Sequence, residues 1–70
     1  MKIRDFIDLM DEKEHICIED LDKQVDDMEL YCGAVGDLKQ NDPIMDMEVI
    51  GIVAINDLIC AGVRKTSMHP

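Results

Sequence analysis

Apolar residues near the start of the chain recur with the spacing of one helical face. Ile3, Phe6, Ile7 and Met10 stand at positions i, i+3, i+4 and i+7, which is the spacing of an amphipathic helix. The pattern therefore predicts a short helix over residues 3–10. A helix of this length is marginal in isolation, so we expect its apolar stripe to pack against the rest of the protein.

The next two apolar segments alternate with the two-residue period of strands. They cover residues 15–19 and residues 28–35. The second is interrupted by Gly33, and a glycine inside a strand often marks a bulge or a close backbone approach. The polar stretch at residues 20–27 predicts the tip of a long hairpin that joins the two strands as antiparallel neighbours.

The longest apolar run comes late in the chain. Residues 48–55 carry apolar side chains on both faces, which predicts a strand that is covered on both sides. The Asp-Pro pair at residues 42–43 is typical of a helix start, with the aspartate as N-cap and the proline in the first helical position. The Asn-Asp pair at residues 56–57 is a two-residue turn signal that leads into a last strand at residues 58–63.

Together these elements predict one α+β domain over residues 1–63, followed by a flexible C-terminal tail at residues 64–70. The expected order is α-β-β-turn-β-β, with a short N-terminal helix packed on a four-stranded, mainly antiparallel sheet. A helix this short cannot cover four strands. Either other subunits cover the remaining apolar surface, or the sheet curls on itself into a small barrel that hides both faces.

Composition limits the kind of partner. The chain has 70 residues, of which 47% are hydrophobic, and sixteen acidic against seven basic residues give a formal net charge of -9. This composition argues against intrinsic disorder. The charge repels phosphates and anionic lipid and attracts basic surfaces. We therefore expect no direct nucleic-acid or membrane contact, and we expect a basic protein or the protein's own subunits as partners.

The same charge has a simpler explanation, because many acidic proteins are merely kept soluble by it. The N-terminal segment has Asp5 and Asp8 within its apolar pattern, which does not fit a signal peptide, and no apolar run approaches the length of a membrane span. We expect a cytoplasmic protein.

The acidic residues are concentrated in one part of the chain. Nine of them lie between Asp11 and Glu29, an interval with only two lysines. The predicted hairpin would gather them at one end of the molecule, where they would imitate the phosphates of nucleic acid and occupy a groove on a basic protein. A solvated tip that discourages edge-to-edge aggregation is the alternative. The candidate partner-binding residues are Glu19, Asp20, Asp22, Asp26, Asp27 and Glu29.

Metal-binding patterns are incomplete. Asp20 begins a segment that resembles an EF-hand loop, but Val25 stands where glycine is required and Tyr31 replaces the last glutamate. His15 and Cys17 can share a strand face, yet a zinc site needs two further ligands. We therefore expect no metal and no cofactor.

The three cysteines, Cys17, Cys32 and Cys60, form no C-x-x-C pair. An odd number of cysteines without such a pair indicates reduced thiols in a reducing compartment. Because each lies in an apolar stretch, we expect the cysteines to be buried like small apolar side chains.

Side chains suited to catalysis are few. The only serine and the only threonine, Ser67 and Thr66, lie in the predicted tail, together with the second histidine, His69. A nucleophile also needs a base and an orienting group, and the chain has no glycine-rich phosphate-binding motif. We therefore expect a binding protein without catalytic residues, not an enzyme.

Three segments carry a resemblance to a known group of proteins. They read E-L-Y-C-G-A-V-G-D-L at residues 29–38, M-E-V-I-G-I at residues 47–52 and I-C-A-G-V at residues 59–63. With the N-terminal helix, they are similar to small acidic orphan proteins of phages and prophages of low-GC Gram-positive bacteria. The resemblance covers about residues 1–63 and rests on short structural motifs. It implies a mobile-element origin and assigns no functional residue.

Three functions from different classes follow from these features. The leading hypothesis is a phage-type, non-catalytic protein that inhibits a host bacterial defence protein, in the manner of anti-CRISPR proteins or of other anti-defence proteins, with acidic nucleic-acid mimicry as one mode of binding. The second is an oligomeric sponge that sequesters a nucleotide immune signal. The third is a structural or regulatory protein of a mobile element. In the second case the phosphates would have to meet Lys2, Arg4, Lys13, Lys23 and Lys39.

Overall fold

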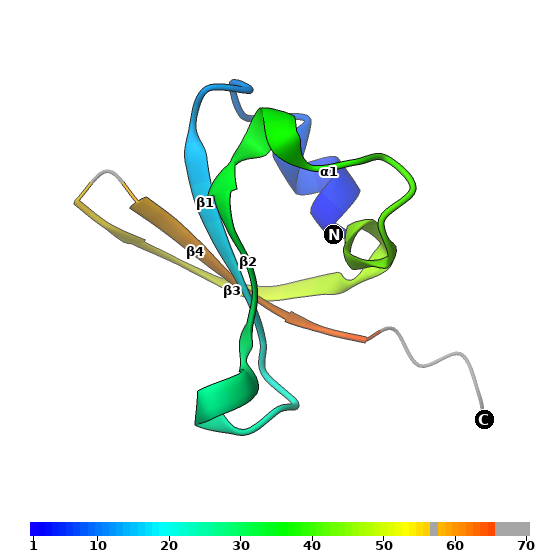
Figure 1. Ribbon diagram of the computed structural model, residues 1–70, viewed down its shortest axis with the longest axis vertical. Coiled ribbons are helices and arrows are strands. Elements are labelled where there is room, and N and C mark those ends of the chain that lie inside the picture. The colour runs from blue at the N-terminus through cyan, green and yellow to red at the C-terminus, as the bar shows by residue number, and fades with distance from the viewer. Residues whose placement is uncertain (57, 66–70) are drawn as a thin grey trace.

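Four strands form one open sheet, and a short helix lies against one of its faces (Figure 1). The computed structural model describes residues 1–56 and 58–65. The strand order is β2-β1-β4-β3, in which β1–β2 and β3–β4 are antiparallel and β1–β4 is parallel. The predicted α+β class with a mainly antiparallel sheet is thus confirmed. The elements are α1 (Ile3–Ile7), β1 (His15–Asp20), η1 (Val25–Asp27), β2 (Glu29–Ala34), η2 (Val35–Asp37), η3 (Pro43–Asp46), β3 (Glu48–Ile55) and β4 (Leu58–Arg64).

The N-terminal helix is shorter than the apolar stripe predicted. It ends at Ile7, because the N–H groups of Leu9 and Met10 donate to carbonyls only three residues back, at 3.1 and 3.0 Å. Such bonds tighten the last turn and end a helix. The stripe itself is correct, since Ile3 and Ile7 are buried and Met10 packs beside them. None of the helices in the described residues has the length and apolar character needed to cross a bilayer.

The hydrophobic core lies between the sheet and the layer formed by α1 and η3. Ile16 and Ile18 of β1 are fully buried at its centre, where Ile18 stands beside Ala61 of β4. The start of η3 is as predicted, because the Asp42 carboxylate accepts the N–H of Ile44 at 3.0 Å. The buried core side chains are those of Ile3, Ile7, Ile16, Ile18, Val35, Ile44, Met45, Met47, Ala61 and Val63.

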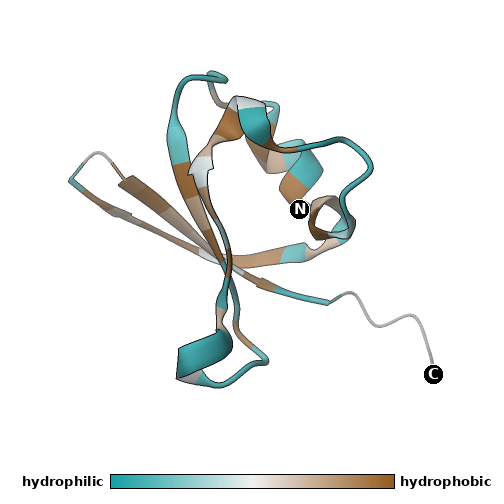
Figure 2. Ribbon diagram, in the orientation of Figure 1, coloured by the Kyte–Doolittle hydropathy of each residue, from teal (hydrophilic) through white to brown (hydrophobic). Residues whose placement is uncertain are grey.

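The long apolar strand has the predicted bounds, but the expectation that both its faces are covered is wrong. From Ile50 to Ile55 every residue of β3 is exposed. The reason is that β3 is an edge of the sheet and that α1 makes few contacts with it. Figures 1 and 2 show the β3–β4 hairpin projecting away from the helix with apolar residues along it. The closed-barrel alternative is also wrong, since β2 and β3 remain unjoined edges.

Smaller details of the sheet depart from the sequence pattern. The register shifts at Ile18/Glu19 and at Val49/Gly51, so neither bulge lies at Gly33. Gly33 instead leaves room for an aromatic side chain, because a Cβ there would lie 3.0 Å from the Tyr31 hydroxyl.

Asn56, which follows β3, has the backbone conformation expected for the predicted turn. Asn56 has a positive φ of 56°, which is the conformation that a tight hairpin turn requires. Its neighbour in the turn signal, residue 57, lies outside the described residues. β4 continues to Arg64, one residue into the predicted tail. Residues 66–70 of that tail, with Thr66, Ser67 and His69, also lie outside the described residues.

Candidate functional site

The six candidate carboxylates belong to the β1–β2 hairpin. β1 ends at Asp20, η1 follows at the tip, and β2 begins at Glu29. In Figure 1 this tip extends beyond the sheet, at the opposite end of the view from α1. Lys23 is the only lysine or arginine between residues 15 and 34. The hairpin therefore brings the predicted residues together at a projecting, strongly negative end of the molecule.

Asp20 differs from the other carboxylates because it is buried, with only 3% of its surface exposed. Its side chain accepts the backbone N–H of Asp22 at 2.9 Å, and its own N–H donates to the carbonyl of Met28 at 2.7 Å. An aspartate that binds the backbone two residues on is a common way to shape a turn. Asp20 thus holds the hairpin tip in place and offers little surface to a partner.

Asp22 is exposed but has a cationic neighbour within the fold. The Nε atom of Arg64, at the end of β4, donates to its carboxylate at 3.0 Å. Both side chains are about half exposed, so the pair adds little stability. Its main effect is electrostatic, because Arg64 offsets the charge of Asp22 and leaves the other acidic residues as the net negative surface.

The remaining four carboxylates have no ion pair within the described part of the chain. Asp26, Asp27 and Glu29 are exposed, and Glu19 is half-buried. Glu19 and Glu29 stand directly opposite each other across β1 and β2. Like charges in that position disfavour strand pairing, so this end of the hairpin has an unbalanced negative charge that a basic group would stabilise.

A row of three cysteines crosses the sheet, and the sequence pattern did not reveal it. Cys17 of β1 lies opposite Cys32 of β2 on one side and Cys60 of β4 on the other. Because Cys17 alternates with the core residues Ile16 and Ile18, the row lies on the outer face, which is the sheet face turned away from α1. The row depends on the parallel β1–β4 pairing, which local sequence patterns do not indicate.

The three thiols differ in exposure. Cys17 is buried, Cys60 is half-buried and Cys32 is exposed, so the prediction that all three are buried is wrong for Cys32. Hydrogen bonding with Cys32, then burial, and then the charges of Cys32 and Cys60 raise the pKa of Cys17 to about 12. Among the described residues, no three His, Cys, Asp or Glu side chains are grouped so as to hold a metal ion.

Tyr31, which follows the bulge region on β2, also has an altered pKa. Burial raises it first, and the charges of Asp37 and Cys32 add to the effect. Its hydroxyl donates to the carbonyl of Ala34 at 2.5 Å. Through this hydrogen bond the hydroxyl supports the end of β2.

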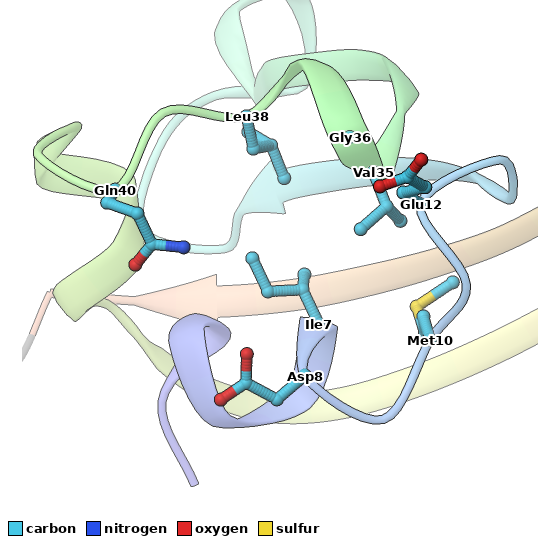
Figure 3. A pocket seen from close by; sticks show the side chains of 8 residues that line it. All are labelled: Ile7, Asp8, Met10, Glu12, Val35, Gly36, Leu38 and Gln40. Atoms are coloured by element: carbon cyan, nitrogen blue, oxygen red, sulfur yellow. The ribbon is translucent and has the colours of Figure 1, made fainter.

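Pockets are also present on the described part of the chain away from the hairpin tip. The one in Figure 3, of about 380 Å³, receives the apolar side chains of Ile7, Val35 and Leu38 between the end of α1 and η2. Its lining includes two carboxylates and no lysine or arginine. The complete lining is Ile7, Asp8, Met10, Glu12, Val35, Gly36, Leu38 and Gln40.

Two further pockets lie on the sheet. One, of about 600 Å³, contains Lys13 and His15 near the β3–β4 turn. The other, of about 400 Å³, is a mostly apolar groove on the outer face with one carboxylate. Its lining is Glu19, Leu21, Gly51, Val53, Ile55, Cys60 and Gly62.

Comparisons of the chain with protein-family models, with curated proteins and with solved structures return no match.

Proposed function

We propose that this protein is a small, non-catalytic binding protein that attaches to a basic protein through the β1–β2 hairpin. The observation that carries the proposal is the facing pair of Glu19 and Glu29. The pair opposes strand pairing in the free chain. A lysine or arginine of a partner placed beside both carboxylates would relieve this repulsion and form charge-assisted hydrogen bonds.

The surroundings of this pair favour the same kind of partner. Asp26 and Asp27 continue the negative surface to the tip, and both are exposed. The tip projects from the sheet (Figure 1), so it can enter a groove on another protein. A groove lined with lysine and arginine is typical of a protein that binds nucleic acid.

The resemblance to phage proteins narrows the proposed target. An acidic hairpin that enters a nucleic-acid groove would act as a mimic of the phosphate backbone. We therefore propose a host defence protein that binds DNA or RNA as the target, with inhibition by occupation of its groove. On this proposal the protein has no catalytic residue.

Sequestration of a nucleotide signal has less support from the geometry. The pocket of Figure 3 has Asp8 and Glu12 in its lining, and these would repel phosphate groups. Arg4, one of the basic residues expected to meet phosphates, pairs instead with Asp46 at 3.0 Å. Native mass spectrometry of the protein purified from bacteria tests this directly, because a retained nucleotide adds a few hundred daltons to the protein's mass.

The binding proposal is tested with two variants of equal net charge. The hairpin variant carries Glu19→Gln, Asp26→Asn, Asp27→Asn and Glu29→Gln. The control variant carries Asp8→Asn, Glu12→Gln, Glu14→Gln and Asp37→Asn, all at exposed positions outside the hairpin tip. Each protein is immobilised and offered the host proteins that cation-exchange chromatography retains. Any host protein that binds the wild type is purified, and its affinity for the wild type and for both variants is measured.

We expect the hairpin variant to bind at least about tenfold more weakly, mainly through slower association, and the control to stay within about twofold. Binding should weaken as salt rises, because salt screens exposed charges. The wild-type protein should also displace DNA from the partner. Equal binding by the hairpin variant, or a complex that binds DNA unchanged, would contradict the proposal.

A further inference from the structure

The outer edge of β3 is open along most of its length. At its beginning the edge is covered by the N-terminus, because Ile3 donates to the carbonyl of Met47 at 3.0 Å and Val49 donates to that of Met1 at 2.7 Å. From Ile50 to Ile55, no other strand of the described residues pairs with this edge. An edge strand of this kind presents free N–H and C=O groups to another strand.

This edge lacks the features that normally prevent strand pairing. Proteins protect exposed edges with charged residues or proline, and residues 49–55 contain neither. Ile50, Ile52, Val53 and Ile55 are each between 47% and 58% exposed. In a chain of net charge -9, such a neutral segment is also where two identical molecules can approach with the least repulsion.

The backbone pattern shows which groups are free. Ile55 and Leu58 form the pair next to the hairpin loop, and such a closing pair is hydrogen-bonded across the hairpin. Alternation then turns the N–H and C=O groups of Ile52 and Ala54 away from β4, toward the open edge. The bond from Val49 to Met1 agrees with this alternation once the extra residue at the Val49/Gly51 register shift is counted.

We propose that β3 pairs in antiparallel fashion with β3 of a second copy, about a two-fold axis at Val53. In this register Val53 faces itself, Ile52 faces Ala54 of the second copy, and Gly51 faces Ile55 of the second copy. A two-fold axis at Ile52 would instead need the backbone groups of Val49 to pair with the second copy. The N–H of Val49 already donates to the carbonyl of Met1. The N-terminal arm thus disfavours the register centred on Ile52.

Side-chain sizes are complementary in this register. On either side of the central Val53 pair, large residues face small ones, which is the arrangement that packs without voids. A Cβ built on Gly51 meets nothing within 4 Å, so the space above it is empty in the single chain. Ile55 of the second copy would fill that space and extend the apolar groove of the outer face across the two-fold axis.

The pairing also suits the charge distribution. β3 and β2 are opposite edges of the sheet, so a dimer through β3 forms a continuous eight-stranded sheet with one acidic hairpin at each far end. The two negative tips are then as far apart as the sheet allows. The dimer would present two binding tips, although its formation does not depend on what they bind.

Gly51→Val tests the pairing with little risk to the fold. Because the space at Gly51 is open and its φ is not positive, valine should fit the single chain, and its strand preference should maintain or raise the unfolding temperature. In the dimer the added methyl groups would collide with Ile55 of the second copy. The double variant Gly51→Val with Ile55→Ala restores the room and should associate again.

Sedimentation equilibrium over a range of concentrations measures the outcome. We expect the wild-type mass to rise from 8.0 kDa toward twice that value, reversibly, because a single strand pair is a small interface. Gly51→Val should remain at 8.0 kDa, and Leu9→Gln, which leaves the net charge unchanged at an exposed position outside β3, should behave as the wild type. Association should strengthen with salt, which screens the repulsion between copies.

Three results would overturn this pairing. They are a wild-type mass of 8.0 kDa at all concentrations up to the solubility limit, association of Gly51→Val equal to that of the wild type, and growth beyond a dimer. Binding to the basic partner should weaken as salt rises, whereas association of two copies should strengthen. A failure of this inference can therefore be told apart from a failure of the proposed function.

Discussion

Glu19 on β1 lies directly opposite Glu29 on β2, beside the register shift that follows Ile18. The hairpin therefore keeps two like charges face to face, although the same hairpin gives Asp22 a cationic partner in Arg64. This contrast separates carboxylates that serve the fold from those that are free for a partner. We therefore expect a positive charge at residue 29 to stabilise the fold and to weaken binding to the proposed basic partner.

Reversing the charge of Glu29 should stabilise the isolated protein. Glu29→Lys replaces a repulsive cross-strand pair with an attractive one, and we expect a gain of about 0.2–1 kcal/mol in unfolding free energy at low salt. Urea denaturation measures the gain, which should shrink as salt rises. Asp27→Lys makes the same charge change at a position outside the strand pairing and serves as the control. An equal gain in the control would show that only net charge matters.

Asp20 and Asp22 should differ in their contribution to stability, although they are only two residues apart. Asp20→Ala leaves the N–H of Asp22 without its buried acceptor, which should cost about 1–3 kcal/mol. Asp20→Asn keeps an acceptor oxygen and should recover most of that loss. Asp22→Ala breaks only an exposed ion pair and should cost about 1 kcal/mol or less. Equal losses for Asp20→Ala and Asp22→Ala would contradict this division.

Local patterns in the sequence predicted where the helices and strands lie better than they predicted how far each is buried. The continuous apolar run at residues 48–55 predicted the bounds of β3, because strand formation depends on nearby side chains and backbone preference. Its exposure depends instead on strand order, and two apolar faces do not show whether a strand is central or at an edge. The parallel pairing that places Ile18 beside Ala61 was not predictable, since nothing local indicates which distant strands become neighbours.

The candidate site shows the same limit. Composition correctly predicted that the hairpin concentrates acidic residues, but it treated the six carboxylates as equivalent. Burial distinguishes Asp20, and the neighbour brought in by β4 distinguishes Asp22. The alignment of Cys32, Cys17 and Cys60 likewise requires three strands in register, so their spacing along the chain carried no sign of it.

Two isoleucines with the same side chain should show how burial determines stability. Ile18 is fully buried and Ile52 is 49% exposed. Ile18→Ala should cost about 2–5 kcal/mol, which is a large share of the roughly 4–10 kcal/mol expected for a domain of this size. Ile52→Ala should cost about 1 kcal/mol or less at concentrations where the chain is monomeric. Chemical denaturation of both variants measures the difference, and similar losses would contradict the core described above.

The cysteine row should make stability depend on pH in the alkaline range. The pKa of Cys17 is raised from 9.0 to about 12, so the folded protein retains a proton that the unfolded chain releases above pH 9. At a pH where the thiol is protonated in both the folded and the unfolded state, the protonated thiol stabilises the folded state. The contribution of Cys17 is therefore constant below about pH 9 and is lost as the pH rises toward 12.

Unfolding measured in urea from pH 7 to pH 11, under reducing conditions, tests this dependence. Cys17→Ala should be less stable at pH 7 because it leaves a small gap, but its stability should fall less steeply above pH 9. Tyr31, whose pKa is also raised, contributes the same slope to both proteins and cancels in the comparison.

Thiol labelling gives an independent check of the same row. Cys32 is exposed and Cys17 is buried between two neighbours, so iodoacetamide at pH 8 should modify Cys32 first and Cys17 last, because the thiolate is the reactive form. Two results together would contradict the row of thiols: equal loss of stability with pH in the wild type and in Cys17→Ala, and labelling of Cys17 as fast as that of Cys32. The parallel pairing of β1 with β4 would then be in question.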